Sequence, residues 1–260
     1  MPETVIALIA AMPEETRPLL RRVGSYRTER LATFPLYRFT IAGRTCCLIE
    51  SGMGPEHAAA AAGALLALVS PCLLLNFGFG GAVSAGPGIG DVVVAERVFC
   101  YVNGQFTEEP GLSRLPTDAI PTLPENDCRV KPFALLRGTF ITTSEIVTKS
   151  VMAARLPAIT GHPVLEMETA AVARAAATAG IPLIAVRAIS DDAHEELGFA
   201  ITDFTDGQMN LRLSRVLLAV ARNPRLIPQL LRLSHNTGIA GRNLAATVEA
   251  VISGLDGGTP

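Results

Sequence analysis

The sequence predicts an α/β domain whose mainly parallel or mixed sheet is covered by helices on both faces. Short apolar runs alternate with helical patterns along the chain, and elements in this order build such sheets. Apolar residues make up 49% of the 260 residues and charged residues 18%, which favours a well-filled core over disorder. A chain of this length fits one large domain, or a somewhat smaller domain with a helical tail.

Each predicted strand is a short apolar or alternating run between turn residues. The first run is followed by Pro13 and two acids, which are typical of a helix N-terminus. Gly43 joins the second and third runs in a hairpin. In chain order, the strands are expected at residues 5–10, 34–41, 44–50, 72–77, 91–95, 138–142, 163–165 and 182–189.

Helices are predicted where apolar residues or alanines recur at helical spacing, namely at residues 13–23, 57–68 and 166–179. From Asn210 onward the chain is predicted to be helical, with breaks at Pro224 and near residues 238–241. The segment from Asn103 to Asp127 is rich in proline and polar residues. We expect it to be a long loop that acts as a lid or an interface.

Bulk properties exclude several classes of function. The net charge of −2 gives no general attraction to nucleic acid. The five cysteines form no CxxC or Cys/His ligand pattern, so neither a disulfide framework nor a metal site is expected, and a reducing cytoplasm fits them. Acids follow the first apolar run too soon for a signal peptide, and no apolar stretch reaches the ~18 residues of a membrane span.

Acidic residues stand at three predicted strand ends or helix starts, where α/β folds place functional groups. They are Glu15, the pair Glu166 and Glu168, and Asp191. Each could be catalytic, or could only cap a helix. The glycine-rich segment 76–82 allows backbone to approach a ligand, but it could equally be a tight turn, and it lacks the setting of a dinucleotide fingerprint.

Taken together and in order, several motifs resemble the purine nucleoside phosphorylase superfamily, and in particular the 5′-methylthioadenosine/S-adenosylhomocysteine nucleosidases. The resemblance implies one α/β domain over residues 1–220, with a central twisted mixed sheet, and a helical C-terminal extension over 221–260. The motifs are Ala11-Met12-Pro13-Glu14-Glu15, Ser51-Gly52-Met53-Gly54, Asn76 to Ala82, Gly90-Asp91-Val92-Val93-Val94, Leu165-Glu166-Met167-Glu168-Thr169-Ala170-Ala171 and Val186-Arg187-Ala188-Ile189-Ser190-Asp191.

The resemblance implies hydrolysis of the N-glycosidic bond of a 5′-substituted adenine nucleoside, with release of adenine and without metal or organic cofactor. Asp191 matches the acid that protonates adenine N7, and burial would keep its carboxyl protonated near neutral pH. Glu15 matches the base that activates water, and Glu168 the acceptor for the ribose hydroxyls. The remaining substrate-site positions implied are Met53, Ile146, Val147, Met167, Phe79, Gly80, Arg187 and Ser190. Met167 would lie against the sugar, the Val147 backbone would read the adenine edge, and Arg187 and Ser190 would support the Asp191 loop.

Two substitutions bear on the nucleophile and the substrate. The phosphorylases have an arginine and a serine where this chain has Asn76 and Phe79, so water is favoured over phosphate. Ile146 stands where the related nucleosidases stack an aromatic ring on adenine, which implies an altered pocket. A phosphate-dependent phosphorylase is the alternative enzyme. A non-catalytic nucleoside-binding or storage protein is the alternative of another class, although it need not keep all three acids.

The C-terminal part resembles the hopanoid-associated nucleoside phosphorylase-like subgroup, which implies an adenine nucleoside carrying a lipid. No Asp or Glu occurs from Gly207 to Val248, whereas six arginines do. These helices could contact a membrane surface, or could pack on the domain with a solvated arginine face. The resemblance also implies a homodimer, with the loop over 103–127 near the partner's 5′ pocket.

Overall fold

The computed structural model describes residues 5–110, 112, 132–145, 147–156, 161–191, 193 and 227–255. Its strands are β1 (Val5–Ala10), β2 (Arg27–Leu31), β3 (Phe34–Ile41), β4 (Arg44–Glu50), β5 (Leu73–Ala82), β6 (Val92–Val102), β7 (Gln105–Glu108), β8 (Leu135–Thr143), β9 (Val164–Glu166) and β10 (Leu183–Asp191). Its helices are α1 (Pro13–Val23), α2 (Pro55–Leu68), α3 (Lys149–Ala153), α4 (Thr169–Ala179) and α6 (Ile227–Gly254).

All of these strands belong to one mixed sheet, part of which closes on itself. Strand β5 pairs with β10, β10 with β6, β6 with β8, β8 with β9, and β9 returns to β5. From β5 the sheet also continues through β1, β4 and β3 to β2, and β7 pairs with β6. Strand β5 is therefore shared by the closed ring and the open wing.

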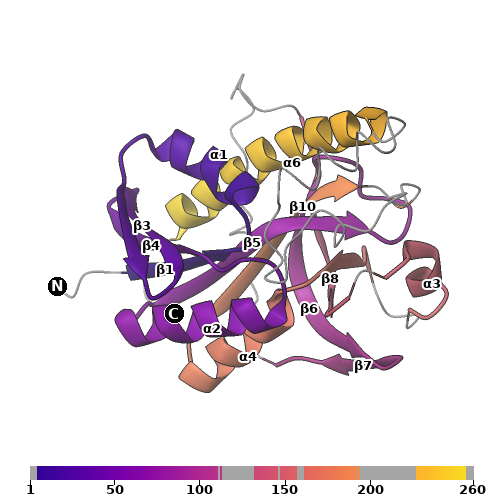
Figure 1. Ribbon diagram of the computed structural model, residues 1–260, viewed down its shortest axis with the longest axis horizontal. Coiled ribbons are helices and arrows are strands. Elements are labelled where there is room, and N and C mark those ends of the chain that lie inside the picture. The colour runs from indigo at the N-terminus through magenta and orange to yellow at the C-terminus, as the bar shows by residue number, and fades with distance from the viewer. Residues whose placement is uncertain are drawn as a thin grey trace.

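Helices cover both faces of the sheet, with α1 and α6 on one face and α2 and α4 on the other (Figure 1). The pleat of β1 divides its apolar residues between the two layers, because successive side chains point to opposite faces. Ile6 and Leu8 belong to the core cluster that contains α1 and α6, whereas Ala7 and Ile9 belong to the cluster under α2 and α4. A third cluster, which includes Phe140, packs among the strands of the ring.

The predicted mixed α/β sheet is confirmed, and the predicted hairpin is β3 with β4. The glycine-rich segment is not a turn: β5 continues to Ala82, because β10 and then β9 pair with its second half. Helix α4 begins at Thr169, three residues later than predicted. Strand β2, which pairs with β3, was not predicted, and β7 occupies part of the predicted loop 103–127.

Helix α6 was predicted to break near Gly238 and Gly241, and this was wrong. The helix runs through both, because Gly241 lets α6 approach α1 closely. A Cβ atom at Gly241 would lie 3.1 Å from Cγ of Pro18 and 3.2 Å from the carbonyl oxygen of Glu14. Tertiary packing therefore outweighs the ~1 kcal/mol propensity cost of a helical glycine. The predicted break at Pro224, and the predicted boundary at 220/221, lie outside the described residues.

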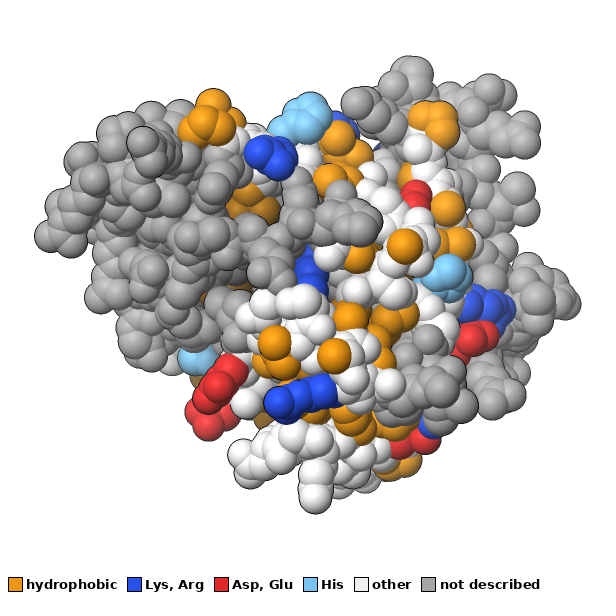
Figure 2. Space-filling model, turned by 90° about the vertical axis from the view of Figure 1, so that its right-hand side faces the viewer, with side chains coloured by type: hydrophobic (Ala, Val, Ile, Leu, Met, Phe, Trp, Pro, Cys, Tyr) orange, Lys and Arg blue, Asp and Glu red, His pale blue; other side chains and the backbone are white. Residues whose placement is uncertain are grey.

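In Figure 2 the described basic, acidic and apolar side chains of one face lie interspersed rather than gathered by kind. Among the described residues, no helix is long and apolar enough to cross a membrane. Within the same part of the chain, no group of His, Cys, Asp and Glu residues is arranged to hold a metal ion. The described cysteines, Cys46, Cys47, Cys72 and Cys100, are free thiols.

Candidate active site

Glu15 is a buried carboxylate at the first turn of α1. Its Oε2 accepts hydrogen bonds from the backbone N–H groups of Ala11 and Met12, at 2.8 and 3.0 Å. Its Oε1 accepts another from the N–H of Phe79 in β5, at 2.8 Å. Burial raises the pKa of Glu15, and the Phe79 N–H opposes that rise. The site therefore holds a fixed carboxyl group whose proton affinity is increased, as a general base requires.

The glycine at position 78 makes room for this carboxylate. A Cβ atom at Gly78 would lie 2.6 Å from Oε1 of Glu15, closer than real Cβ contacts allow. One interpretation of the glycine-rich segment was that its backbone approaches a ligand; in the structure, the backbone at Gly78 closely approaches the Glu15 carboxylate. The structure thus gives a steric reason for one glycine of this segment.

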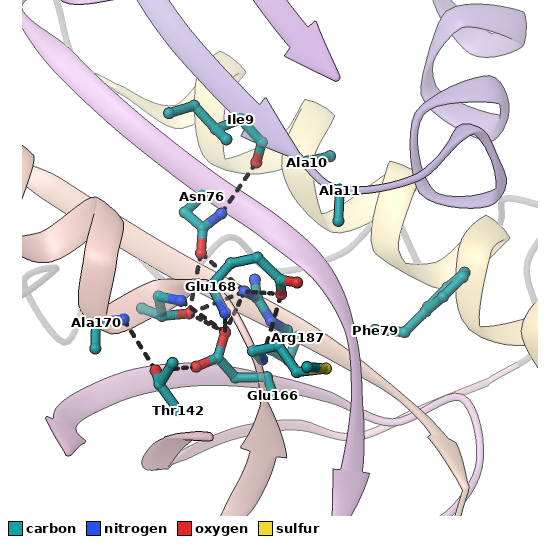
Figure 3. A network of polar contacts seen from close by, with 12 residues as sticks. Ile9, Ala10, Ala11, Asn76, Phe79, Thr142, Glu166, Glu168, Ala170 and Arg187 are labelled. Carbon is teal, nitrogen blue, oxygen red and sulfur yellow. Dashed lines mark hydrogen bonds and ion pairs between the residues drawn. The ribbon is translucent and has the colours of Figure 1, made fainter. Parts of the chain in front are cut away.

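A buried polar network joins strands β5, β8, β9 and β10 behind the site (Figure 3). Nη2 of Arg187 lies 2.6 Å from Oε2 of Glu166 and 2.9 Å from Oδ1 of Asn76. It also lies 2.9 Å from Oγ1 of Thr169, and the Thr142 hydroxyl donates to the other Glu166 oxygen. Burial alone would raise the pKa of Glu166, but Arg187 and these hydroxyls lower it below its ordinary value. Glu166 is therefore the counter-ion of Arg187.

Glu168 lies between this network and the loop before α2. Its Oε1 accepts a hydrogen bond from the N–H of Gly54 at 2.9 Å, and Nη2 of Arg187 is 3.7 Å from its Oε2. Burial, followed by the negative charge of Glu166, raises the pKa of Glu168 to about 7. The paired acids thus have different environments: Glu166 binds Arg187 and the Thr142 and Thr169 hydroxyls, whereas Glu168 accepts hydrogen bonds from backbone N–H groups.

Asp191 ends β10 and is held by two neighbours. The hydroxyl of Ser190, a residue predicted to support this loop, donates to its Oδ1 at 2.7 Å. Nζ of Lys149 forms an ion pair with Oδ2 and a hydrogen bond of 3.1 Å to the Asp191 carbonyl oxygen. The sequence predicted a carboxyl kept protonated by burial, and the structure places an ammonium group against it. Arg187, predicted to support the same loop, instead binds Glu166.

The other predicted site residues differ in their surroundings. Met53, Val147 and Met167 are half-buried. The Phe79 ring points away from the network toward α6 and packs on the core there (Figure 3), so only its backbone contacts Glu15. Packing explains why position 80 is a glycine, because a Cβ atom there would lie 2.4 Å from Cγ1 of Val164. Ile146 lies outside the described residues.

Lys149 is the residue that sequence reasoning missed. Its signal was compositional: the chain contains twenty arginines but only two lysines, Lys131 and Lys149. A lysine in a chain that otherwise uses arginine is a candidate for a role that arginine cannot fill. The contact with Asp191 joins residues 42 positions apart, so no local pattern could reveal it.

Comparisons with known proteins show which proteins this chain is similar to. The 5′-methylthioadenosine/S-adenosylhomocysteine nucleosidase of Haemophilus influenzae (strain PittEE) is 28% identical over 215 residues, which are 76% of this chain and 91% of that protein. The enzyme of the same name from Halalkalibacterium halodurans is 24% identical over 229 residues, covering 84% and 99%.

The fold is shared with solved structures. A crystal structure of the nucleosidase of the same name from Campylobacter jejuni superposes with a TM-score of 0.71 at 20% identity and covers 97% of this chain and all of that one. A futalosine hydrolase structure from Helicobacter pylori gives a TM-score of 0.69 at 15% identity, with coverages of 97% and 98%. The model of the Phosphorylase superfamily matches residues 5–222, and the chain therefore belongs to that superfamily.

Proposed function

We propose that this protein hydrolyses the N-glycosidic bond of a 5′-substituted adenine nucleoside and releases adenine. The observation that carries the proposal is the gathering of Glu15, Glu168 and Asp191 around the glycine segment of β5. A Cβ atom at Gly78 would meet Glu15, and one at Gly81 would meet Asp191. Both acids therefore contact the glycine segment of β5, at positions three residues apart.

The environments of the acids suit three different tasks. Glu15, held by backbone N–H groups, takes a proton from the attacking water. Glu168 accepts hydrogen bonds from the ribose hydroxyls, with its second oxygen steadied by Arg187. Asp191 delivers the proton to N7 of adenine, so that the C1′–N9 electron pair can leave with the base. This division resembles that of the paired carboxyls in glycosidases, where environment decides which group is the acid.

Water is favoured over phosphate as the nucleophile, because the groups near β5 that could bind an anion are already engaged. The Asn76 amide donates to the Ile9 carbonyl at 3.2 Å and accepts from Arg187. The Phe79 N–H binds Glu15, and Phe79 has no hydroxyl. Arg187 is only 1% exposed and is neutralised by Glu166. Phosphate binding in proteins relies on charged hydrogen-bond donors that are free to contact the phosphate. The donors of these residues are already used in other contacts.

The test is to follow adenine release from methylthioadenosine, S-adenosylhomocysteine and an adenosine with a lipid at its 5′ carbon, with and without phosphate. We expect free ribose derivatives in both buffers. A ribose 1-phosphate as the main product would establish the alternative, a phosphorylase. Binding of nucleosides without any release of adenine would favour a storage or carrier protein.

A lipid-bearing nucleoside is the second candidate substrate, and we propose that the C-terminal helices help to present it. The support is the acid-free stretch from Gly207 to Val248, together with Leu231, which is 66% exposed at the start of α6. A cavity of about 490 Å³ between α1 and α6 is lined in part by Arg17, Arg21 and Arg242, which suit an anionic headgroup.

Liposome co-sedimentation tests this contact. The full chain should bind anionic vesicles more strongly than a chain in which Arg17 and Arg242 are changed to Gln, and salt should weaken the binding. Equal binding of the two chains, or none, would assign the arginines to ordinary surface solvation. Full activity on methylthioadenosine in that case would favour the smaller substrate.

We further propose that the protein acts as a cytoplasmic homodimer, with the segment 103–127 near the partner's 5′ pocket. The free cysteines support a reducing compartment, and the resemblance of the motifs supports the dimer. Light scattering after size exclusion, at concentrations across the micromolar range, would give the mass. A monomer that is fully active would contradict the shared pocket.

A further inference from the structure

Lys149 and Asp191 form a largely buried ion pair at the end of β10. The Lys149 side chain is 9% exposed and that of Asp191 17%, so both are largely shielded from water. Nζ contacts the carboxylate and also the carbonyl oxygen of the same residue. Ser190 occupies the other carboxylate oxygen. The carboxylate is thereby fixed on both sides, one of them by a cation.

The backbone is shaped to admit this pair. Asp191 lies opposite Gly81 across the β5–β10 ladder, where the register shifts between Ile189 and Asp191. A Cβ atom at Gly81 would lie 2.6 Å from Oδ2 of Asp191 and 3.0 Å from Cε of Lys149. Any side chain at this position would therefore displace the acid, the lysine or both. A second glycine of the segment, after Gly78, thus has a steric reason tied to a functional acid.

The ion pair raises the question of where Asp191 obtains the proton that it delivers to N7 of adenine. The Asp191 carboxylate contacts an ammonium group, yet N7 of adenine must receive a proton if adenine is to leave. An arginine in this place could hold the carboxylate but could not give up its own proton, because guanidinium stays charged in proteins. Lysine can do both.

On the basis of the proposed nucleosidase function, we propose that Lys149 positions Asp191 and supplies the proton that Asp191 passes to N7. The step moves one proton from the Lys149 ammonium to the carboxylate and one from the carboxyl to N7. The C1′–N9 bond breaks with its electron pair going to the purine, and water gives its hydroxyl to C1′ and its proton to Glu15. The site is left with a Lys149 amine and a protonated Glu15, and transfer between them through solvent restores the starting state.

The first test compares Lys149→Met and Lys149→Arg with the wild type on two substrates. Methylthioadenosine needs a protonated leaving group, whereas 4-nitrophenyl β-D-ribofuranoside does not. We expect both variants to lose roughly 10²-fold or more in kcat on the nucleoside, the range for a missing general acid, and to stay near wild type on the nitrophenyl riboside. Arg155→Met is the matched control, since its side chain contacts Tyr101 rather than Asp191.

The second test measures binding of adenine and 7-deazaadenine by calorimetry, and it needs no turnover. The wild type should prefer adenine, which can accept a proton or hydrogen bond at N7, and both Lys149 variants should lose most of that preference. Equal losses on both substrates, an unchanged binding preference, or full rescue by Lys149→Arg would overturn the proposal. The wild type could release no adenine and still prefer adenine over 7-deazaadenine in a way that depends on Lys149. That result would refute the nucleosidase function but would support the contact of the Lys149–Asp191 pair with N7.

Discussion

Replacing Glu168 with Gln should change how the stability of the protein depends on pH. The carboxyl is buried beside Glu166, which raises its pKa from 4.5 to about 7. Between these two values the folded protein holds a proton that the unfolded chain has released. Stability is therefore lost as the pH rises through this window. Gln has no proton to lose, and its carbonyl oxygen can still accept the hydrogen bond from Gly54.

The size of the effect follows from the same two pKa values. The raised pKa of Glu168 lowers the free energy of unfolding by about 3 kcal/mol at pH 8 but by only about 1.5 kcal/mol at pH 5.5. The free energy of unfolding of Glu168→Gln, compared with that of the wild type, should therefore improve by about 2 kcal/mol between pH 5.5 and pH 8.

Urea unfolding at four or five pH values across this range measures the difference directly. Glu109→Gln is a suitable control, because Glu109 pairs with Arg174 away from the Arg187 network. Parallel pH profiles for Glu168→Gln and the wild type would refute the reasoning, since they would mean that Glu168 titrates alike in the folded and unfolded states.

Three further substitutions have defined outcomes. Asp191→Asn should lower the rate of adenine release by about 10²–10⁴-fold in a protein that still folds, and near wild-type release would remove Asp191 from the mechanism. Arg187→Met should cost about 3–5 kcal/mol in chemical unfolding by leaving buried Glu166 unpaired, and a loss below about 1 kcal/mol would mean that Glu166 finds another partner. Gly78→Ala should displace Glu15 and reduce kcat by up to about 10²-fold, whereas wild-type kinetics would show that the strand can yield.

Much of the architecture could be predicted from the sequence, because it depends on local patterns. The apolar run of β1 and Pro13 at the start of α1 are visible in any short window. The three acids stood out since each follows a strand. Strand β2 escaped prediction because its residues are mostly exposed and charged, so no apolar alternation marks it.

The partnerships within the site could not be predicted, because they arise from closure of the ring. Arg187 was expected near the Asp191 loop, its neighbour in sequence. The pairing of β5 with both β9 and β10 brings it to Glu166 instead. The Lys149 contact likewise joins residues 42 positions apart, next to a register shift at the end of β10, and no sequence periodicity encodes either feature.

The position of α6 has a consequence for how the protein is made. This helix shares a core cluster with α1 and the first strand, and Arg22 of α1 forms an ion pair with Glu249 of α6. On the ribosome, β1 and α1, which carry Glu15, are synthesised first. Helix α6, which packs against them, follows only after more than two hundred further residues. The exposed apolar face is a natural binding surface for chaperones during that interval. A nascent chain stalled before Ile227 should accordingly be both inactive and prone to aggregate.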